Sequence, residues 1–324
     1  MLYPFTFKPI FKEIIWGGSE ILQFKGIPKD SRKIGESWEL SNVDQNFSIV
    51  ANGVLAGKTI EELIQEYGEL LLGAKVFRQS GYTFPLLIKF IDACDDLSIQ
   101  VHPNDQIAME RHHSLGKTEM WYVVKASSEA FLYSGFSQQI DADEYVRRIE
   151  DGTLSHVLKK YLVEAGDVFF LPAGRVHAIG SGCFIAEIQQ TSDLTYRLFD
   201  YNRKDANGKI RKLHTGLAKE AIDYTVHTSY KTSYHCVENE ASELVECPYF
   251  TTNLLKINQS IHRNYSSVDS FVIFLCIKGK AVLKDNNSHL LTIQQGQTIL
   301  IPANTLYVTI EPVQPSELLE TYIS

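Results

Sequence analysis

Long hydrophobic runs are missing from this sequence. No apolar stretch in the 324 residues approaches the roughly 18 residues that a membrane-spanning helix needs. The opening segment, MLYPFTFKPIFKEIIWGG, carries lysines and a glutamate that interrupt each apolar stretch, unlike a secretory signal peptide. We therefore expect a protein without a membrane partner.

Paired cysteines and an excess of positive charge are missing as well. The cysteines are odd in number, scattered and without a C-x-x-C pair, which is typical of reduced thiols in a cytoplasmic protein. They are Cys94, Cys183, Cys236, Cys247 and Cys276. The net charge is −8, which argues against nucleic acid as a partner. A phosphate-bearing ligand would need a local basic cluster to overcome that charge.

Short apolar runs rich in β-branched and aromatic residues dominate the sequence. Each is bounded by glycine, proline or aspartate, as expected for strands separated by turns. The runs are FPLLIKFIDA (84–93), EMWYVV (119–124), DVFFLPA (167–173), CFIAEIQQ (183–190), SFVIFLCIKG (270–279) and QTILIPA (297–303). Many short strands of this kind predict an all-β protein built from jelly rolls or barrels.

Helical signals are few and short. Thr59 and Glu62 form a capping box that opens an amphipathic stretch ending at Gly73. Further short helices are expected at residues 104–113, 142–149, 155–162 and 217–224. The polar and poorly periodic segment 225–247 is expected to cross between domains. We therefore predict a first domain at 1–235 with small helical insertions and a second at 236–324.

One motif occurs twice with the same internal spacing. In the first copy, Gly166, Pro172 and Gly174 precede His177; in the second, GQTILIPANTLY, a tyrosine ends the motif at position 307. Glycine and asparagine accept a positive φ most readily, so position 174 and its counterpart Asn304 can serve the same turn. The repeat predicts two similar domains, of which one kept a metal ligand and the other kept only the fold.

Upstream of the first copy, the segment LSIQVHPND supplies two more candidate ligands. If residues 98–102 form a strand, Gln100 and His102 point to the same face, because side chains alternate along a strand. Glu119 begins the next apolar run, and His177 completes the set. Two imidazoles and a carboxylate are a common site for a divalent metal, and an amide oxygen completes four ligands. These residues leave zinc, iron, manganese and cobalt open, with zinc preferred.

Three cations accompany these ligands. Lys117 lies two residues before Glu119, Lys89 interrupts an apolar run, and Arg197 is flanked by apolar and aromatic residues. A buried lysine is costly unless an anion compensates for it. Glu187 and Asp193 precede the arginine. Cations beside a metal in an acidic protein indicate a phosphate or a developing oxyanion in the pocket.

Several of these motifs, in this order, resemble the type I mannose-6-phosphate isomerases in their short bacterial form. They are IWGG (15–18), GESWELS (35–41), QVHPND (100–105), GKTEMWYV (116–123), LPAGRVHAIGSG (171–182) and the spacing of Glu187, Asp193 and Arg197. The resemblance covers essentially the whole chain. It implies two cupin domains, a catalytic one with zinc at 1–235 and a degenerate one without metal at 236–324. Longer members carry a large helical insert, where only short helices are expected here.

The resemblance also implies a reaction and roles for the site residues. The reaction is interconversion of mannose 6-phosphate and fructose 6-phosphate through a cis-enediol, with one zinc ion per chain. Arg197 is implied to be catalytic, with Glu187 or Lys117 as the acid or base, and Lys89 and Asp193 as substrate contacts. The family's zinc ligands correspond to His102, Glu119, His177 and, less uniformly, Gln100. The expected partner is a phosphosugar, and the expected state is a monomer or weak homodimer.

Two other functions fit the residues. A cupin oxygenase would hold Fe(II) with two histidines and a carboxylate, but a fourth ligand at Gln100 leaves less open coordination, and the cations suit a phosphosugar better than an apolar substrate. A sugar-binding double cupin without turnover is the other alternative. The first copy of the motif keeps its full set of chemical residues, which favours catalysis.

Overall fold

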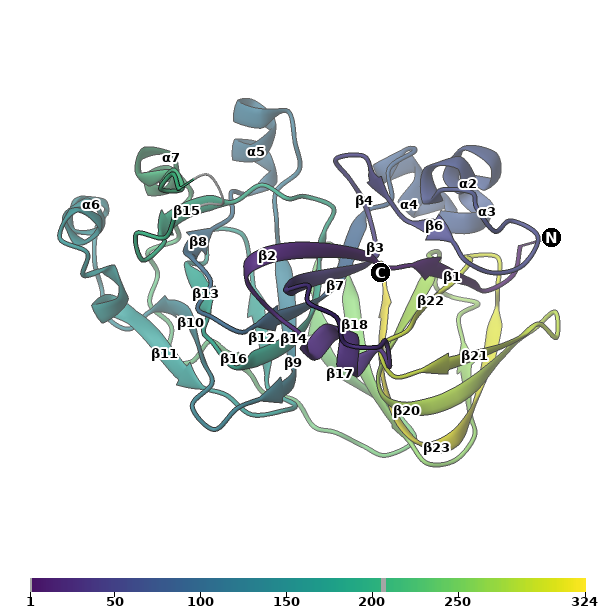
Figure 1. The fold of residues 1–324 in the computed structure, drawn as a ribbon. Helices are drawn as coiled ribbons and strands as arrows, with labels where there is room; N and C mark the ends of the chain where they lie inside the picture. The colour runs from purple at the N-terminus through teal and green to yellow at the C-terminus, as the bar shows by residue number, and fades with distance from the viewer. Residues whose placement is uncertain (1, 205–207) are drawn as a thin grey trace.

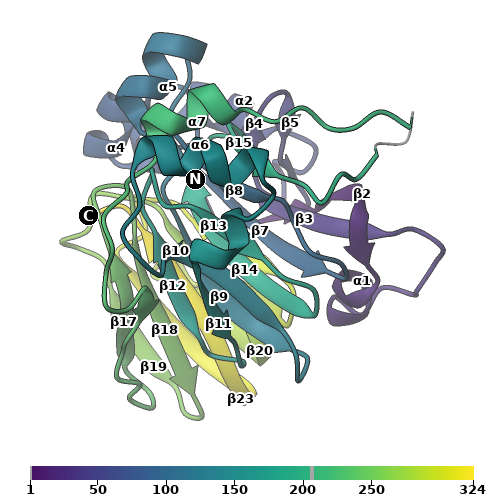
Figure 2. The same cartoon turned by 90° about the vertical axis from the view of Figure 1, so that its left-hand side faces the viewer.

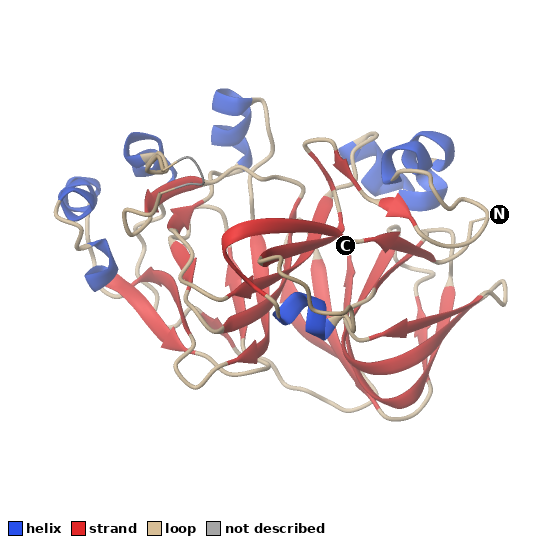
Figure 3. Ribbon diagram, in the orientation of Figure 1, coloured by secondary structure: helices blue, strands red, loops and turns tan. Residues whose placement is uncertain are grey.

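The computed structural model describes residues 2–204 and 208–324 and consists mainly of antiparallel strands (Figures 1 and 3). The prediction of an all-β fold with two cupin domains is confirmed. Within the described residues, no helix is long and apolar enough to cross a membrane.

Two sheets form the walls of the first barrel. The five-stranded sheet has the order β11 (Leu158–Leu162), β10 (Phe131–Phe136), β13 (His177–Ile179), β8 (Ile99–Val101) and β15 (Tyr196–Phe199). The seven-stranded sheet has the order β16 (Lys231–Thr232), β12 (Val168–Leu171), β9 (Glu119–Ala126), β14 (Cys183–Gln190), β7 (Leu86–Ala93), β3 (Ile34–Leu40) and β2 (Ile10–Gly18).

A nine-stranded sheet forms the second barrel, at the right in Figure 1. Its main path is β17 (Ala241–Glu246), β18 (Thr251–Ile257), β23 (Tyr307–Tyr322), β20 (Val272–Asp285), β22 (Thr298–Ile301), β1 (Phe5–Lys8) and β6 (Ile49–Val50). Off this path, β19 (Ile261–Asn264) pairs with β23, and β21 (Leu290–Gln294) pairs with β20. A separate small hairpin joins β4 (Asn42–Val43) and β5 (Asn46–Phe47).

The first strand of the chain lies in the sheet of the second barrel. In β1, Phe5 pairs with Leu300 of β22, and Phe7 pairs with Val50 of β6. The segment 225–247, expected to cross between domains, contributes a short strand to each barrel, β16 to the first and β17 to the second. The division of the chain into domains at 1–235 and 236–324 remains a prediction. Strand β1 belongs to the first of these ranges but pairs with β22 in the second.

Side chains alternate between the two faces of the seven-stranded sheet, so this sheet contributes to two apolar cores. In β9, Trp121 and Val123 face the first barrel's interior, whereas Met120 and Tyr122 face the second barrel. The outward side chains join Phe271, Leu300 and other buried residues of the second barrel in one continuous core. The two barrels are therefore packed face to face through apolar side chains.

The helices are short, and all but α1 lie along the top and the left side of the molecule in Figure 3. They are α1 (Glu20–Phe24), α2 (Ile60–Tyr67), α3 (Glu69–Leu72), α4 (Ala74–Ser80), α5 (Asp105–His112), α6 (Ala142–Glu150), α7 (Thr215–Ala221) and the 3-10 helix η1 (Leu154–Val157). In Figure 2, α5, α6 and α7 gather at the upper end of the strands.

Most helix predictions are confirmed within a few residues. Thr59 accepts a hydrogen bond from the Glu62 main chain, and the Glu62 carboxylate accepts one from the Thr59 main chain, which completes the capping box of α2. The predicted helix at 155–162 is wrong. One 3-10 turn ends at Val157, and β11 follows because this segment pairs with β10 along the sheet edge.

The repeated motif folds in the same way in both barrels. Gly166 and Gly296 both have positive φ, at 94° and 79°, just before β12 and β22. Each proline then opens a turn, since Pro172 O accepts from Arg175 N and Pro302 O accepts from Thr305 N. Gly174 has φ 90°, but Asn304 is not among the residues with positive φ. The two positions were expected to serve the same turn; the proline-opened hydrogen bond is shared, but only Gly174 adopts the positive φ.

Candidate active site

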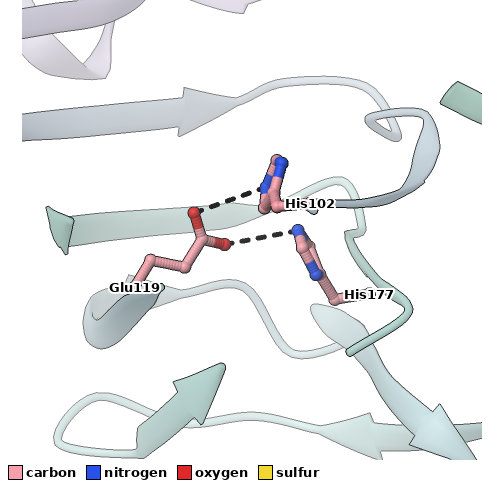
Figure 4. A group of neighbouring side chains, drawn as sticks. All are labelled: His102, Glu119 and His177. Carbon is pink, nitrogen blue, oxygen red and sulfur yellow. Dashed lines mark ion pairs between the residues drawn. The ribbon is translucent and has the colours of Figure 1, made fainter. Parts of the chain in front are cut away.

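Three predicted metal ligands meet inside the first barrel (Figure 4). Glu119 and His177 are the first residues of β9 and β13, and His102 directly follows β8. His102 Nε2 lies 3.5 Å from one oxygen of Glu119, and His177 Nε2 lies 3.3 Å from the other. All three side chains are at most 2% exposed. The seven-stranded wall thus supplies the carboxylate, and the five-stranded wall supplies the imidazoles.

Main-chain carbonyls set the tautomer of both imidazoles. His102 Nδ1 is 2.9 Å from Leu194 O, and His177 Nδ1 is 2.8 Å from Arg175 O. A carbonyl only accepts, so Nδ1 carries the hydrogen and Nε2 presents its lone pair toward Glu119. Burial lowers the pKa of both histidines, that of His177 to about 3. Both rings are therefore neutral, as a metal ligand must be.

The donor atoms fit a divalent cation. Among the described residues, His102 Nε2 and Glu119 Oε1 are buried without a hydrogen bond, and Glu119 Oε2 contacts the Lys117 ammonium at 3.1 Å. Burial and the nearby Glu187 raise the pKa of Glu119 to about 7. One ligand atom from each of the three residues lies within 4.8 Å of the others, and this is the one such group in residues 2–204 and 208–324. A cation at their centre would satisfy these otherwise costly buried atoms.

Gln100 lies beside this group. It is the register partner of His177 across β8 and β13, and its Nε2 is 3.2 Å from His177 Nε2. A half turn of the amide exchanges its nitrogen and oxygen, which brings the oxygen to the same place. Gln100 is partly exposed, unlike the buried side chains of His102, Glu119 and His177. Its position is compatible with the predicted fourth ligand.

Register explains why residues far apart in sequence share this pocket. In the five-stranded sheet, Ser134 pairs with His177, His177 with Gln100, and Gln100 with Arg197. Directly opposed residues of antiparallel strands project from the same face. The four side chains therefore form one row, which ends at Arg197.

A chain of alternating charges lies on the facing sheet. Lys117 Nζ is 3.1 Å from Glu119 Oε2 and 3.7 Å from Glu187 Oε1, and Lys89 Nζ is 3.0 Å from the same Glu187 oxygen. Burial works to raise the pKa of Glu187, but Lys89 and Lys117 outweigh it and hold that pKa below its ordinary value. Burial likewise opposes the charge of Lys89, and the carboxylates of Glu187 and Glu36 more than compensate, so its pKa is raised. Glu187 is therefore ionised and Lys89 is charged.

Arg197 and Asp193 are the more exposed members of the predicted site. Within the described residues, Arg197 has no carboxylate partner, and its Nε is buried without a hydrogen bond. The nearby Asp200 is occupied by Arg203 and Arg211. Asp193 is an exposed residue of the loop before β15, and its charge helps to raise the pKa of Lys89. The structure thus brings every predicted site residue to this one barrel.

Sequence reasoning missed two side chains that hold the charge chain. Trp121 donates its indole hydrogen to Glu187 Oε2 at 2.6 Å, and its ring meets His177 edge-on at a centroid distance of 5.2 Å. Glu36 lies 3.5 Å from Lys89 Nζ. Alternation from Glu119 could have placed Trp121 on the inner face, whereas Glu36 depends on the pairing of β3 with β7.

Comparison with known proteins gives one consistent family. Residues 5–123 match the phosphomannose isomerase type I catalytic domain, and residues 240–313 match the mannose-6-phosphate isomerase cupin domain. Mannose-6-phosphate isomerase ManA of Bacillus subtilis is 36% identical over 303 residues, covering 92% of this chain and 93% of that protein. Mannose-6-phosphate isomerase of Streptococcus mutans is 34% identical over 293 residues, covering 90% of each.

A solved structure extends the agreement to three dimensions. The crystal structure of mannose 6-phosphate isomerase from Bacillus subtilis superposes with a TM-score of 0.88 at 32% identity, covering 99% of both chains. These matches favour the isomerase over the oxygenase and over a binding protein without turnover.

Proposed function

Because the chain belongs to the type I mannose-6-phosphate isomerase family and is an enzyme of that class, we propose that it interconverts mannose 6-phosphate and fructose 6-phosphate through a cis-enediol with one zinc ion per chain. The observation that carries the metal-dependent part of this proposal is the pair of buried atoms without a hydrogen bond, His102 Nε2 and Glu119 Oε1, beside a neutral His177.

We propose that His102, Glu119 and His177 hold the zinc, with Gln100 as the fourth ligand. When bound, zinc would supply a Lewis acid that polarises a substrate oxygen without redox chemistry. The mixed set of two imidazoles, a carboxylate and an amide oxygen is a nitrogen and oxygen site suited to zinc, and Gln100 is its partly exposed member.

Glu187 is the proposed base. Its lowered pKa keeps it ionised at neutral pH, and its buried Oε1 faces the ammonium groups of Lys89 and Lys117, at 3.0 and 3.7 Å. It would take the proton from C2 of the aldose and return it to C1, while the hydroxyl proton moves from O2 to O1. Lys117, between Glu187 and Glu119, is placed to donate a hydrogen bond to the developing oxyanion.

Arg197 is proposed to bind negative charge on the substrate. Lys89 and Lys117 are each neutralised by buried carboxylates, whereas the guanidinium of Arg197 has no carboxylate partner among the described residues. It is therefore available for an oxygen pair of the enediolate or the phosphate, which its planar fork matches. Asp193 and Lys89 are the proposed substrate contacts around it.

A coupled assay on the purified protein tests this function. We expect conversion of mannose 6-phosphate to fructose 6-phosphate, loss of activity after chelation and recovery with added zinc. His177→Ala should lose zinc and activity together, because only one imidazole, one carboxylate and the amide of Gln100 would remain as ligands. A chelated protein that keeps full activity with no bound metal, or a His177→Ala protein with stoichiometric zinc, would contradict the proposed metal site.

A further inference from the structure

The segment that carries Lys117 lies outside the strands and is held by side chains as well as by two main-chain hydrogen bonds, one of them from Gln190 N to Thr118 O. Glu119 is fixed in β9, where it pairs with Leu171 and Gln189. Lys117 and Thr118 precede that strand, and a hydrogen bond from Lys117 N to Pro103 O holds the backbone on one side. The position of the Lys117 ammonium therefore depends on the loop, whereas Glu119 depends on the sheet.

Gln190 and Asp105 hold this loop. Gln190 Oε1 accepts from Thr118 N at 2.8 Å, and its Nε2 donates to Asp105 Oδ1 at 3.0 Å. The same Asp105 oxygen accepts from Gly116 N at 2.8 Å. The buried amide of Gln190 and the carboxylate of Asp105 thus hold the backbone on both sides of Lys117. We call these two residues and their hydrogen bonds to Gly116 and Thr118 the clamp.

The clamp is completed from the second barrel. Tyr249, in the turn between β17 and β18, donates its hydroxyl hydrogen to Asp105 Oδ2 at 2.6 Å. Burial and the hydrogen bond to Asp105 raise the pKa of Tyr249, so the hydroxyl remains a donor at neutral pH. The carboxylate of Asp105 only accepts hydrogen bonds, and its three partners are all donors.

Packing around the clamp is incomplete. A cavity of about 510 Å³ adjoins it, lined by Asp105, Gln190 and Tyr249 together with Leu115 and Ile323. On this side the loop borders open space, so the hydrogen bonds contribute most of what fixes its position.

We infer that Tyr249 is a positioning residue for the isomerisation. Through Asp105 and Gln190, it keeps Lys117 between Glu119 and Glu187, so that the second barrel sets the geometry of a site that lies wholly in the first. This inference rests on the proposed function, because the role it assigns is placement of the oxyanion donor.

Tyr249→Phe removes only the hydroxyl group, and Asp105→Asn keeps the shape but cannot accept from all three donors. For both variants, steady-state kinetics with mannose 6-phosphate should show kcat about 5- to 20-fold lower, as expected for a slightly misplaced catalytic group. KM should stay within about 2-fold, since Arg197 is untouched, and zinc content should equal that of the wild type, since Glu119 is fixed by its strand. Assays are run well below the unfolding temperature of each variant.

Tyr234→Phe is the matched control. The Tyr234 hydroxyl also donates across the molecule, to Gly166 O at 2.8 Å, but that carbonyl is outside the clamp. Its kcat should match the wild type. Wild-type kcat in either folded variant, or an equal loss in the control, would overturn the inference. Absence of isomerase activity in the wild type would instead refute the proposed function.

Discussion

His102 and His177 are neutral because the barrel interior cannot stabilise their charged forms. Their Nε2 atoms face Glu119, and a protonated ring would have to be solvated in a pocket where both side chains are at most 2% exposed. The positive charge of Lys117 opposes protonation further. The same burial that prepares these rings to bind a metal therefore costs stability whenever they must be protonated.

This cost predicts a pH dependence for the metal-free protein. The folded pKa of His177 is about 3, against 6.5 for the free side chain, so the unfolded chain binds the proton first as pH falls. Stability is fully present above about 6.5 and is lost as pH falls toward about 3. We expect His177 alone to account for about 3 kcal/mol between pH 6.5 and about pH 4.

Denaturant titrations of chelated wild type and His177→Gln measure this contribution. Glu119, whose raised pKa acts in the opposite direction as pH rises through about 7, is present in both proteins, so the difference between the two profiles reports His177 together with its contact to Glu119. Identical pH profiles for the two proteins would show that His177 is not buried as a neutral ring.

Arg197 gives a second prediction at this scale. Arg197→Lys keeps the charge but loses the planar fork, so we expect kcat to fall by about 10² with little change in zinc content or melting temperature. Kinetics, metal analysis and calorimetry on one preparation measure all three. Near-normal kcat with reduced thermal stability would mean that the residue is structural.

At the scale of elements, the repeated turn leads to different interiors in the two barrels. His177 is buried beside Glu119, whereas Tyr307 at the same position is 51% exposed. Inside the second barrel, Glu320 on β23 is instead bound by Arg263 on β19 at 2.8 and 2.7 Å. Tyr265 and Asn253 also donate to it. The second barrel thus stabilises its buried carboxylate with a guanidinium, and we predict that it binds no metal.

Arg263→Met tests the energetic importance of this pair. It leaves Glu320 buried without a counter-charge, so the free energy of unfolding should fall by about 3 kcal/mol. Zinc content should not change. Arg148→Met is the control, because Arg148 pairs with Glu144 on the surface of α6 and its loss should cost under about 1 kcal/mol. Equal, small losses in both variants would contradict a structural role for the buried pair.

At the scale of the molecule, the two barrels are joined by segments and side chains that cross the boundary between the N-terminal and C-terminal parts of the chain. Strand β1 lies in the nine-stranded sheet of the second barrel. Carbonyls of α3 accept hydrogen bonds from the main chain of Ala303 and Asn304. One apolar core joins the facing sheets of the two barrels. Neither barrel can expose its half of that core without a large loss of buried apolar area. We therefore expect the chain to unfold as one unit.

Phe5→Ala tests this unity. Phe5 is fully buried between the barrels, so its truncation should cost about 3 to 5 kcal/mol and lower a single calorimetric transition. Leu162→Ala, at a side chain that is 70% exposed, should have little effect. Two separate transitions, with only one sensitive to Phe5, would show that the barrels unfold independently.

The sequence by itself determined the features that depend on local pattern. Alternation along one strand put Gln100 and His102 together, a turn of defined spacing placed His177, and a capping box opened α2. The repeat likewise predicted two barrels of one kind. These signals are readable because strand period, turn geometry and helix capping involve residues close in sequence.

Tertiary structure decided which of these pieces face one another. The bond from Trp121 to Glu187, the contact of Glu36 with Lys89 and the link from Tyr249 to Asp105 each join segments far apart in sequence. The place of β1 in the second barrel is of the same kind. Such contacts depend on which strands pair and in which register, and a period of two indicates a strand's buried face but not its neighbour.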